Sequence, residues 1–150
     1  MNGIVAINKS SGISSSDVVI RCRNAVSKMA GEKIKCGHFG TLDPAACGVL
    51  LVGFGKSTRL FDYFLDKKKK YRAQFVFGKT TDTLDSFGKV VDTDKLPVTK
   101  DVVSCLTSFV GDILQVPPKF CANSVDGVRA YDMARQGIDV QLQPKKVKIF

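Results

Sequence analysis

The longest apolar run in this sequence is only seven residues long, from residue 48 to residue 54. A helix that crosses a membrane needs about 20 consecutive apolar residues, so no membrane-spanning segment is predicted. Residues 1–7 have neither the basic start nor the apolar length of a signal peptide. The chain is therefore expected to be cytoplasmic and to fold from short helices and strands. Its 150 residues are the size of one domain, which we place at 1–150.

Strand and helix patterns follow one another without the strict alternation of a parallel α/β protein. Short β-branched or alternating segments predict strands at residues 4–7, 49–52, 71–77 and 89–92, before Val116, and at 147–150. Apolar residues at helical spacing predict a helix capped by Ser15 or Ser16, one capped by Ser57, one capped by Thr99 and one after a turn at residues 126–127. Glycines 31, 111 and 137 mark three of their ends. This mixture predicts an α+β fold with a mixed, mainly antiparallel sheet flanked by helices.

The histidine and cysteine content argues against metal sites and a disulfide framework. His38 is the single histidine, and the five cysteines are scattered and contain no C-x-x-C pair. A reducing compartment fits such cysteines best. Residues 53–57 resemble the end of a phosphate-binding loop, but Leu50 stands where that loop requires glycine. We therefore predict no metal and no nucleotide cofactor.

Positive charge is concentrated in the first half of the chain. The net charge is +9 at pH 7, of which residues 1–75 carry +8 and residues 76–150 carry +1. This asymmetry favours a polyanionic partner, although a basic surface without a partner explains it equally well. The densest basic run consists of Lys67, Lys68, Lys69, Lys70 and, after Tyr71, Arg72. Such a run is either a solvated surface or an RNA contact, in which point charges meet phosphates beside an aromatic face.

Two polar loops are candidates for chemistry. In residues 37–44, two glycines allow the backbone to approach a ligand, and His38 and Asp43 supply polar groups. An ordinary Asp-Pro turn with an incidental histidine fits the same residues. In the second loop, Asp82 and Asp85 are either a carboxylate pair or a turn capped by its own side chains. Their spacing does not match a calcium-binding loop.

The first loop belongs to a longer pattern. Residues 37–44 read G-H-F-G-T-L-D-P, and residues 46–50 read A-C-G-V-L. This stretch resembles the catalytic motif of the TruB family of RNA pseudouridine synthases, G-H-x-G-T-L-D-P followed by a short spacer and G-V-L. Residues 8–15, 70–73, 78–83, 115–118 and 134–137 resemble further motifs of the family, the later ones of bacterial type, in the same order. The resemblance covers essentially the whole chain.

The resemblance implies an activity and a set of site residues. TruB-type enzymes convert a uridine in the T-loop of tRNA to pseudouridine, with base flipping and without a cofactor or metal. Asp43 takes the position of the catalytic aspartate, as nucleophile or as base, and Tyr71 that of the tyrosine that packs against the target uracil. His38 takes the position beside the flipped nucleotide, and Lys9 that of a lysine that supports the active-site loop. Asp82 matches an acidic position of the family that would lie at the substrate, and the basic run would contact RNA phosphates.

The chain departs from the family pattern in composition and in length. Ser10 replaces a usual proline, Asn8 a common aspartate, and Phe39 a usual threonine or serine. The later half of family members carries a G-x-Y-[IV]-R motif, whose arginine pairs with the catalytic aspartate, and often an RNA-binding domain; neither is present here. The resemblance thus implies an N-terminal catalytic portion whose partner is a missing C-terminal half. The alternatives are a non-catalytic remnant that binds structured RNA and a guide-RNA-dependent enzyme that modifies ribosomal RNA.

Overall fold

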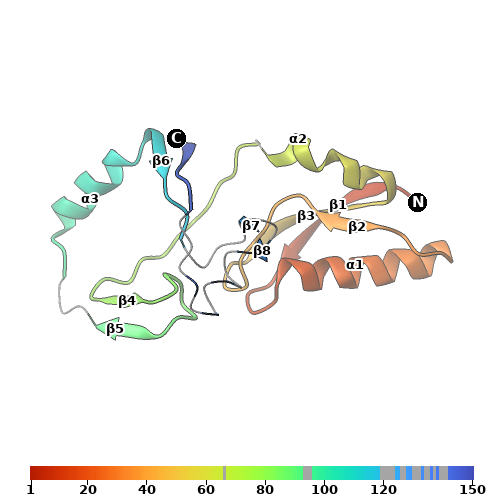
Figure 1. The fold of residues 1–150 in the computed structure, drawn as a ribbon, viewed down its shortest axis with the longest axis horizontal. Helices are drawn as coiled ribbons and strands as arrows, with labels where there is room; N and C mark the ends of the chain where they lie inside the picture. The colour runs from red at the N-terminus through yellow and green to blue at the C-terminus, as the bar shows by residue number, and fades with distance from the viewer. Residues whose placement is uncertain are drawn as a thin grey trace. The chain divides into compact units, whose positions relative to one another are not determined.

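The structure is a computed structural model, and it divides the chain into two compact units, Met1–Arg72 and Ala73–Phe150 (Figure 1). It describes residues 1–65, 67–92, 96–118, 124–125, 128–129, 133, 136, 138 and 142–150. Helices and antiparallel strands are mixed in both units, which confirms the predicted α+β class. None of the described helices is long and apolar enough to cross a membrane.

The first unit is built on a three-stranded antiparallel sheet. Strand β3 (Gly48–Phe54) lies in the middle, between β1 (Gly3–Lys9) and β2 (Cys36–His38). The strands predicted at 4–7 and 49–52 are confirmed, and each extends further. β2 corrects the prediction of a loop from residue 37, because Gly37 pairs with Gly53 and His38 with Val52.

Helix α1 (Ser15–Ala30) packs against this sheet. Its N-cap is Ser14, not Ser15 or Ser16 as predicted, and Gly31 ends it at a φ of 70° as expected. In a capping box, the Asp17 N–H donates to Ser14 Oγ and the Ser14 N–H donates to the Asp17 carboxylate. The hydrogen bonds from Ser14 hold the pKa of Asp17 below its usual value. The helix therefore begins at a well-defined residue, next to the candidate loop.

The core of the first unit lies between α1 and the sheet. Val18 from α1 and Leu50 and Val52 from β3 are buried together. The side chains packed around them are partly buried, namely Val5, Ile7, Ile13, Val19, Cys22, Cys36 and Leu42. Burial raises the pKa of the Cys22 and Cys36 thiols, as expected for apolar surroundings.

The other face of β3 is covered by two stacked aromatic rings. Because side chains alternate along a strand, Gly53 faces away from the core that contains Val52. Phe39 is buried on this face and stacks on Phe64, with ring centroids 4.8 Å apart. Phe64 belongs to α2 (Phe61–Leu65), which follows the 3-10 helix η1 (Gly55–Leu60). The helix predicted to be capped by Ser57 thus starts earlier, as a 3-10 turn after Phe54 without a side-chain cap.

A Cβ on Gly53 would collide with the ring of Phe39. We expect Gly53→Ala to lower the free energy of unfolding by about 1–3 kcal/mol, because a packed ring has to shift. In a Phe39→Thr background the same change should cost less than about 0.5 kcal/mol, since the ring is gone. Urea unfolding of the wild type, the two single variants and the double variant measures this double-mutant cycle. If the losses of stability in the two single variants add up in the double variant, the contact between the ring and position 53 is contradicted.

The second unit contains one described helix and three two-stranded sheets. The paired strands are β4 (Lys79–Thr81) with β5 (Val90–Asp92), β6 (Gly111–Gln115) with β9 (Lys145–Ile149), and β7 (Ser124–Val125) with β8 (Val128–Arg129). Helix α3 (Thr99–Ser108) is preceded by Val98 as N-cap, so Thr99 is its first residue and not its predicted cap. β5, β6 and β9 confirm three predicted strands.

The predicted strand at residues 71–77 is wrong in this structure. Residues 71–76 have no regular structure, and Tyr71 and Phe75 are each 69% exposed. Apolar alternation produces a strand only where another strand pairs with it, and no described strand pairs with this segment. The predicted turn at 126–127 and the helix expected to end at residue 137 fall almost entirely outside the described residues.

Candidate active site

Lys9 connects two loops of the first unit. It is the last residue of β1 and is fully buried. Its Nζ donates to the carbonyl oxygens of Ser10 (3.0 Å), Ile13 (2.8 Å) and Pro44 (3.4 Å). An ammonium group has three protons to donate, so these carbonyls satisfy it completely. The segment between β1 and α1 is thereby held against the segment between β2 and β3.

Further hydrogen bonds hold the same two segments together. The Gly12 N–H donates to the Pro44 carbonyl at 2.8 Å, and Ser11 Oγ donates to the Ala45 carbonyl at 2.9 Å. Ser15 Oγ contacts both backbone polar groups of Leu42. Residues 42, 44 and 45 are thus anchored by residues 9–15. Sequence reasoning quoted residues 8–15 as a motif and gave Lys9 a supporting role, but it missed the roles of Ser11, Gly12 and Ser15, because their partners lie 27 or more residues away in the chain.

Asp43 lies between the anchored residues. Its carbonyl accepts a hydrogen bond from the Ala46 N–H at 3.0 Å, which closes a turn, and Pro44 restricts its backbone. Its side chain is exposed, and within the described residues its carboxylate makes no hydrogen bond or ion pair. The loop therefore presents a carboxylate that is available to a ligand on a backbone that is held on both sides.

His38 stands at the start of this loop. It is the last residue of β2 and is partly buried, and its Nδ1 is buried with no hydrogen-bond partner among the described residues. The next residue, Phe39, anchors the chain by donating its N–H to the Leu51 carbonyl at 2.9 Å. The structure thus places Lys9, His38 and Asp43 around one loop of one unit.

Asp82 lies in the second unit, in the hairpin that joins β4 and β5. Its Oδ1 accepts the Lys89 N–H at 2.8 Å, and the Asp85 carboxylate accepts from Thr83 Oγ1 and the Phe87 N–H. The turn capped by its own side chains is confirmed. Asp82 thus belongs to a different unit of the chain from Asp43.

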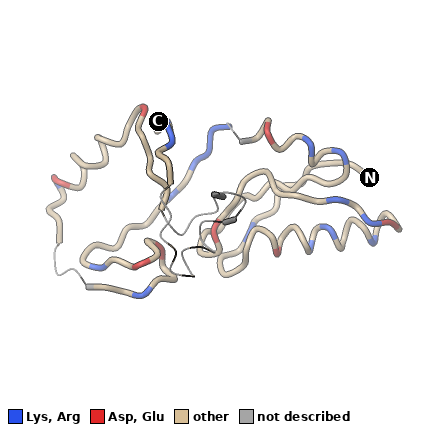
Figure 2. Tube along the Cα trace, viewed as in Figure 1, with Lys and Arg blue, Asp and Glu red and all other residues tan. Residues whose placement is uncertain are grey.

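The basic run follows α2 as an extended segment. Lys67, Lys68, Lys69, Lys70 and Arg72 are all exposed, and Figure 2 shows them as blue tube after α2. Tyr71 is also exposed, at 69%. These residues form a charged surface that includes one aromatic ring.

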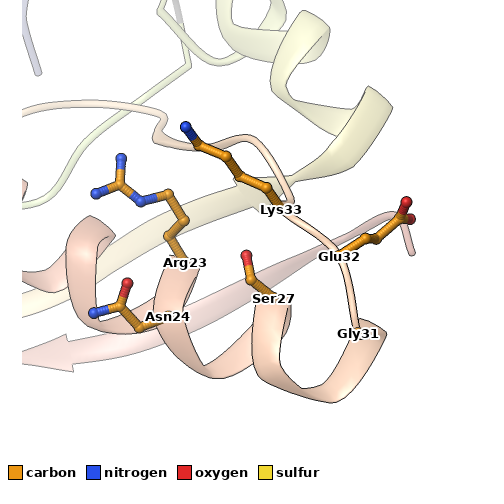
Figure 3. Close-up of a pocket in the computed structure, with 6 residues that line it drawn as sticks. All are labelled: Arg23, Asn24, Ser27, Gly31, Glu32 and Lys33. Atoms are coloured by element: carbon orange, nitrogen blue, oxygen red, sulfur yellow. The ribbon is translucent and has the colours of Figure 1, made fainter.

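A shallow hollow lies elsewhere in the first unit, at the C-terminal end of α1 (Figure 3). Its volume is about 540 Å³, and it is lined by Arg23, Asn24, Ser27, Gly31, Glu32 and Lys33. None of the predicted site residues lines it, because Ser15, which adjoins the Asp43 loop, is at the opposite end of the helix. The described residues also contain no group of three potential metal ligands placed to hold an ion.

Comparison with known proteins decides the family. The family model described as "TruB family pseudouridylate synthase (N terminal domain)" matches residues 27–150. The chain belongs to the TruB family. The family membership inferred from the motif around Asp43 is therefore confirmed.

Relatives of the TruB chain match it along its whole length. It is 47% identical to a tRNA pseudouridine synthase B of Clostridium perfringens, 43% to one of Syntrophotalea carbinolica and 41% to one of Clostridium acetobutylicum. It covers 50%, 48% and 50% of these three proteins. The chain thus spans about half the length of the curated relatives that it matches.

Proposed function

We propose that this TruB-family chain is the N-terminal catalytic portion of a cytoplasmic tRNA pseudouridine synthase that acts on a uridine of the T-loop. The observation that carries the proposal is Asp43, an exposed carboxylate on a loop that Lys9, Gly12 and Ser15 hold in place. The family match and the names of the relatives support the same activity.

The reaction needs few groups from the protein. The bond between ribose C1′ and uracil N1 breaks, the ring rotates, and a bond between C1′ and C5 forms. The C5 proton leaves and N1 gains a proton, so no cofactor or redox partner is required. The Asp43 carboxylate acts at the sugar as nucleophile or base, and it is available for this because it makes no hydrogen bond or ion pair within the described residues. Tyr71 and His38 are proposed to hold the extruded uridine, since a base inside folded RNA has to leave its stack first.

A second polypeptide half is part of the proposal. Asp43 has no cationic partner among the described residues, and the chain covers 50% of its Clostridium perfringens relative. The family resemblance implies an arginine partner in the other half. Exposed apolar side chains are numerous in the second unit, including Phe75, Val91 and Leu114. We propose that the other half covers such side chains and completes the site.

Tritium release from tRNA tests the proposal. A T-loop transcript with 5-³H-uridine loses tritium only if C5 forms the new bond to C1′. The 150-residue chain is assayed alone and together with the second half of the Clostridium perfringens relative as a separate polypeptide. Release in either assay, without any guide RNA, is the expected result. Absence of release in both, with the protein folded and tRNA bound, would sink the catalytic proposal.

The second candidate function is RNA binding without turnover. It is favoured by two observations: the basic run is exposed, and the Asp43 carboxylate has no cationic partner among the described residues. Tight, salt-sensitive association with tRNA and no tritium release, even with the second half present, would establish it.

The basic run makes a separate prediction about RNA affinity. If Lys67, Lys68, Lys69 and Lys70 each contact a phosphate, their joint replacement by alanine should make the negative slope of log K against log salt shallower by about 3. Joint replacement by arginine keeps the charges and should leave the slope unchanged. Binding to the same transcript between about 50 and 200 mM salt measures both. An unchanged slope in the alanine variant would assign the run to a solvated surface.

A further inference from the structure

Ser15 makes an unusual pair of contacts with the residue before Asp43. It is the first residue of α1 and is 3% exposed. Its Oγ donates to the Leu42 carbonyl at 2.8 Å and accepts the Leu42 N–H at 2.9 Å. One buried hydroxyl thus satisfies both backbone polar groups of Leu42.

These two bonds constrain the backbone of Asp43. The Leu42 carbonyl belongs to the peptide plane that joins Leu42 to Asp43, so the Ser15 hydroxyl fixes the plane from which Asp43 departs. On the other side, the Asp43 carbonyl belongs to the peptide plane that joins Asp43 to Pro44, and it accepts the Ala46 N–H at 3.0 Å. The following peptide is held as well, because Lys9 Nζ and the Gly12 N–H donate to the Pro44 carbonyl. Both peptide planes that flank Asp43 are therefore anchored.

The position of Ser15 itself is well determined. The capping box of Ser14 and Asp17 fixes the first turn of α1, and Val18 in the same turn is buried in the core. The hydroxyl is therefore carried by a rigid element. A reactive group held by a rigid scaffold reaches its working geometry without a search, and a displacement of about 1 Å can cost about a hundredfold in rate.

We propose that Ser15 is a positioning residue for Asp43, which sets the direction of its carboxylate through the backbone of Leu42. This inference rests on the proposed function for its effect on turnover. If Ser15 only stabilised the fold, the Ser15→Ala molecules that remain folded would keep the geometry of Asp43. The folded enzyme would then keep the wild-type kcat.

The test compares Ser15→Ala with Ser15→Thr, which keeps a hydroxyl, and with Ser16→Ala as matched control. Ser16 is the next residue of α1, and its side chain is exposed. The first readout is NMR of the 150-residue chain. It measures the rate of solvent exchange of the Leu42 amide and the carboxyl carbon signal of Asp43, which the Asp43→Asn variant assigns. Ser15→Ala should speed exchange of that amide about tenfold and shift or broaden the Asp43 signal. Ser16→Ala should change neither.

The second readout is steady-state tritium release under the conditions that give turnover. Ser15→Ala should lower kcat by roughly 10- to 100-fold while KM stays within about twofold, because substrate contacts are intact. Across the variants, kcat should follow the protection of the Leu42 amide.

Two results would overturn the inference. One is an unchanged Leu42 amide and Asp43 signal in folded Ser15→Ala, and the other is a loss of both with an unchanged kcat. If no preparation turns over uridine, the proposed function fails, whereas the NMR readout still decides whether Ser15 holds Asp43.

Discussion

Asp43→Asn is expected to reduce pseudouridine formation by at least about a thousandfold. An amide has nearly the shape of a carboxylate but can serve neither as nucleophile nor as base at ribose C1′. The carboxylate makes no hydrogen bond or ion pair within the described residues, so its replacement should leave the fold intact. Single-turnover tritium release from the T-loop transcript measures the loss, and urea unfolding checks the fold.

The control for this variant is Asp62→Asn. Asp62 lies in α2, is exposed and is not part of the proposed site, so its variant should retain wild-type rates. Affinity for tRNA should stay within about threefold in Asp43→Asn, since one amide replaces one carboxylate and no phosphate contact is lost. Product formation that persists in purified Asp43→Asn protein would remove Asp43 from the catalytic role.

Lys9→Met is expected to lower the free energy of unfolding by about 3 kcal/mol. Methionine fills the space of the lysine stem but leaves the carbonyls of Ser10 and Ile13 without their donor, whereas the Pro44 carbonyl keeps the Gly12 N–H. An unsatisfied buried polar group costs about 1–3 kcal/mol, and the relief from burying an ammonium charge offsets part of the sum. Urea denaturation of the wild type and the variant gives the difference.

Lys33→Met provides the comparison for Lys9. Lys33 is exposed, so the loss of its charge should change the free energy of unfolding by less than about 0.5 kcal/mol. Equal stability of Lys9→Met and Lys33→Met would show that water can replace the ammonium group and that Lys9 does not tie the two loops.

The sequence alone predicts the elements whose pattern is complete within a short segment. β1, β3 and α1 combine apolar periodicity with clear ends, and all three form where expected. β2 was missed because its residues Cys36, Gly37 and His38 have no strand pattern and are ordered by pairing with β3. The segment 71–77 failed for the opposite reason, since its pattern is complete but no described strand pairs with it.

The candidate site also has a part that the sequence predicts and a part that it does not. The motif around Asp43 is contiguous, so the loop and its family could be identified from the sequence. The bonds that Lys9 and Ser15 make to Pro44 and Leu42 join segments that are 35 and 27 residues apart, and no local pattern encodes them. Asp82 shows a further limit, because the same aspartate fits a capped turn and a functional carboxylate until its partners are known.

The contact between Phe39 and Gly53 limits how parts of this chain can be exchanged with its relatives. Consider a chimera in which the loop with Phe39 is placed in a relative that has a larger residue at the position of Gly53. That residue would push the Phe39 ring off β3 and away from Phe64. Phe39 lies between His38 and Asp43 in the sequence, so its displacement would distort the transferred loop itself. Chimeras of this chain should therefore exchange residues 36–54 as one block, with both loop and strand from the same parent.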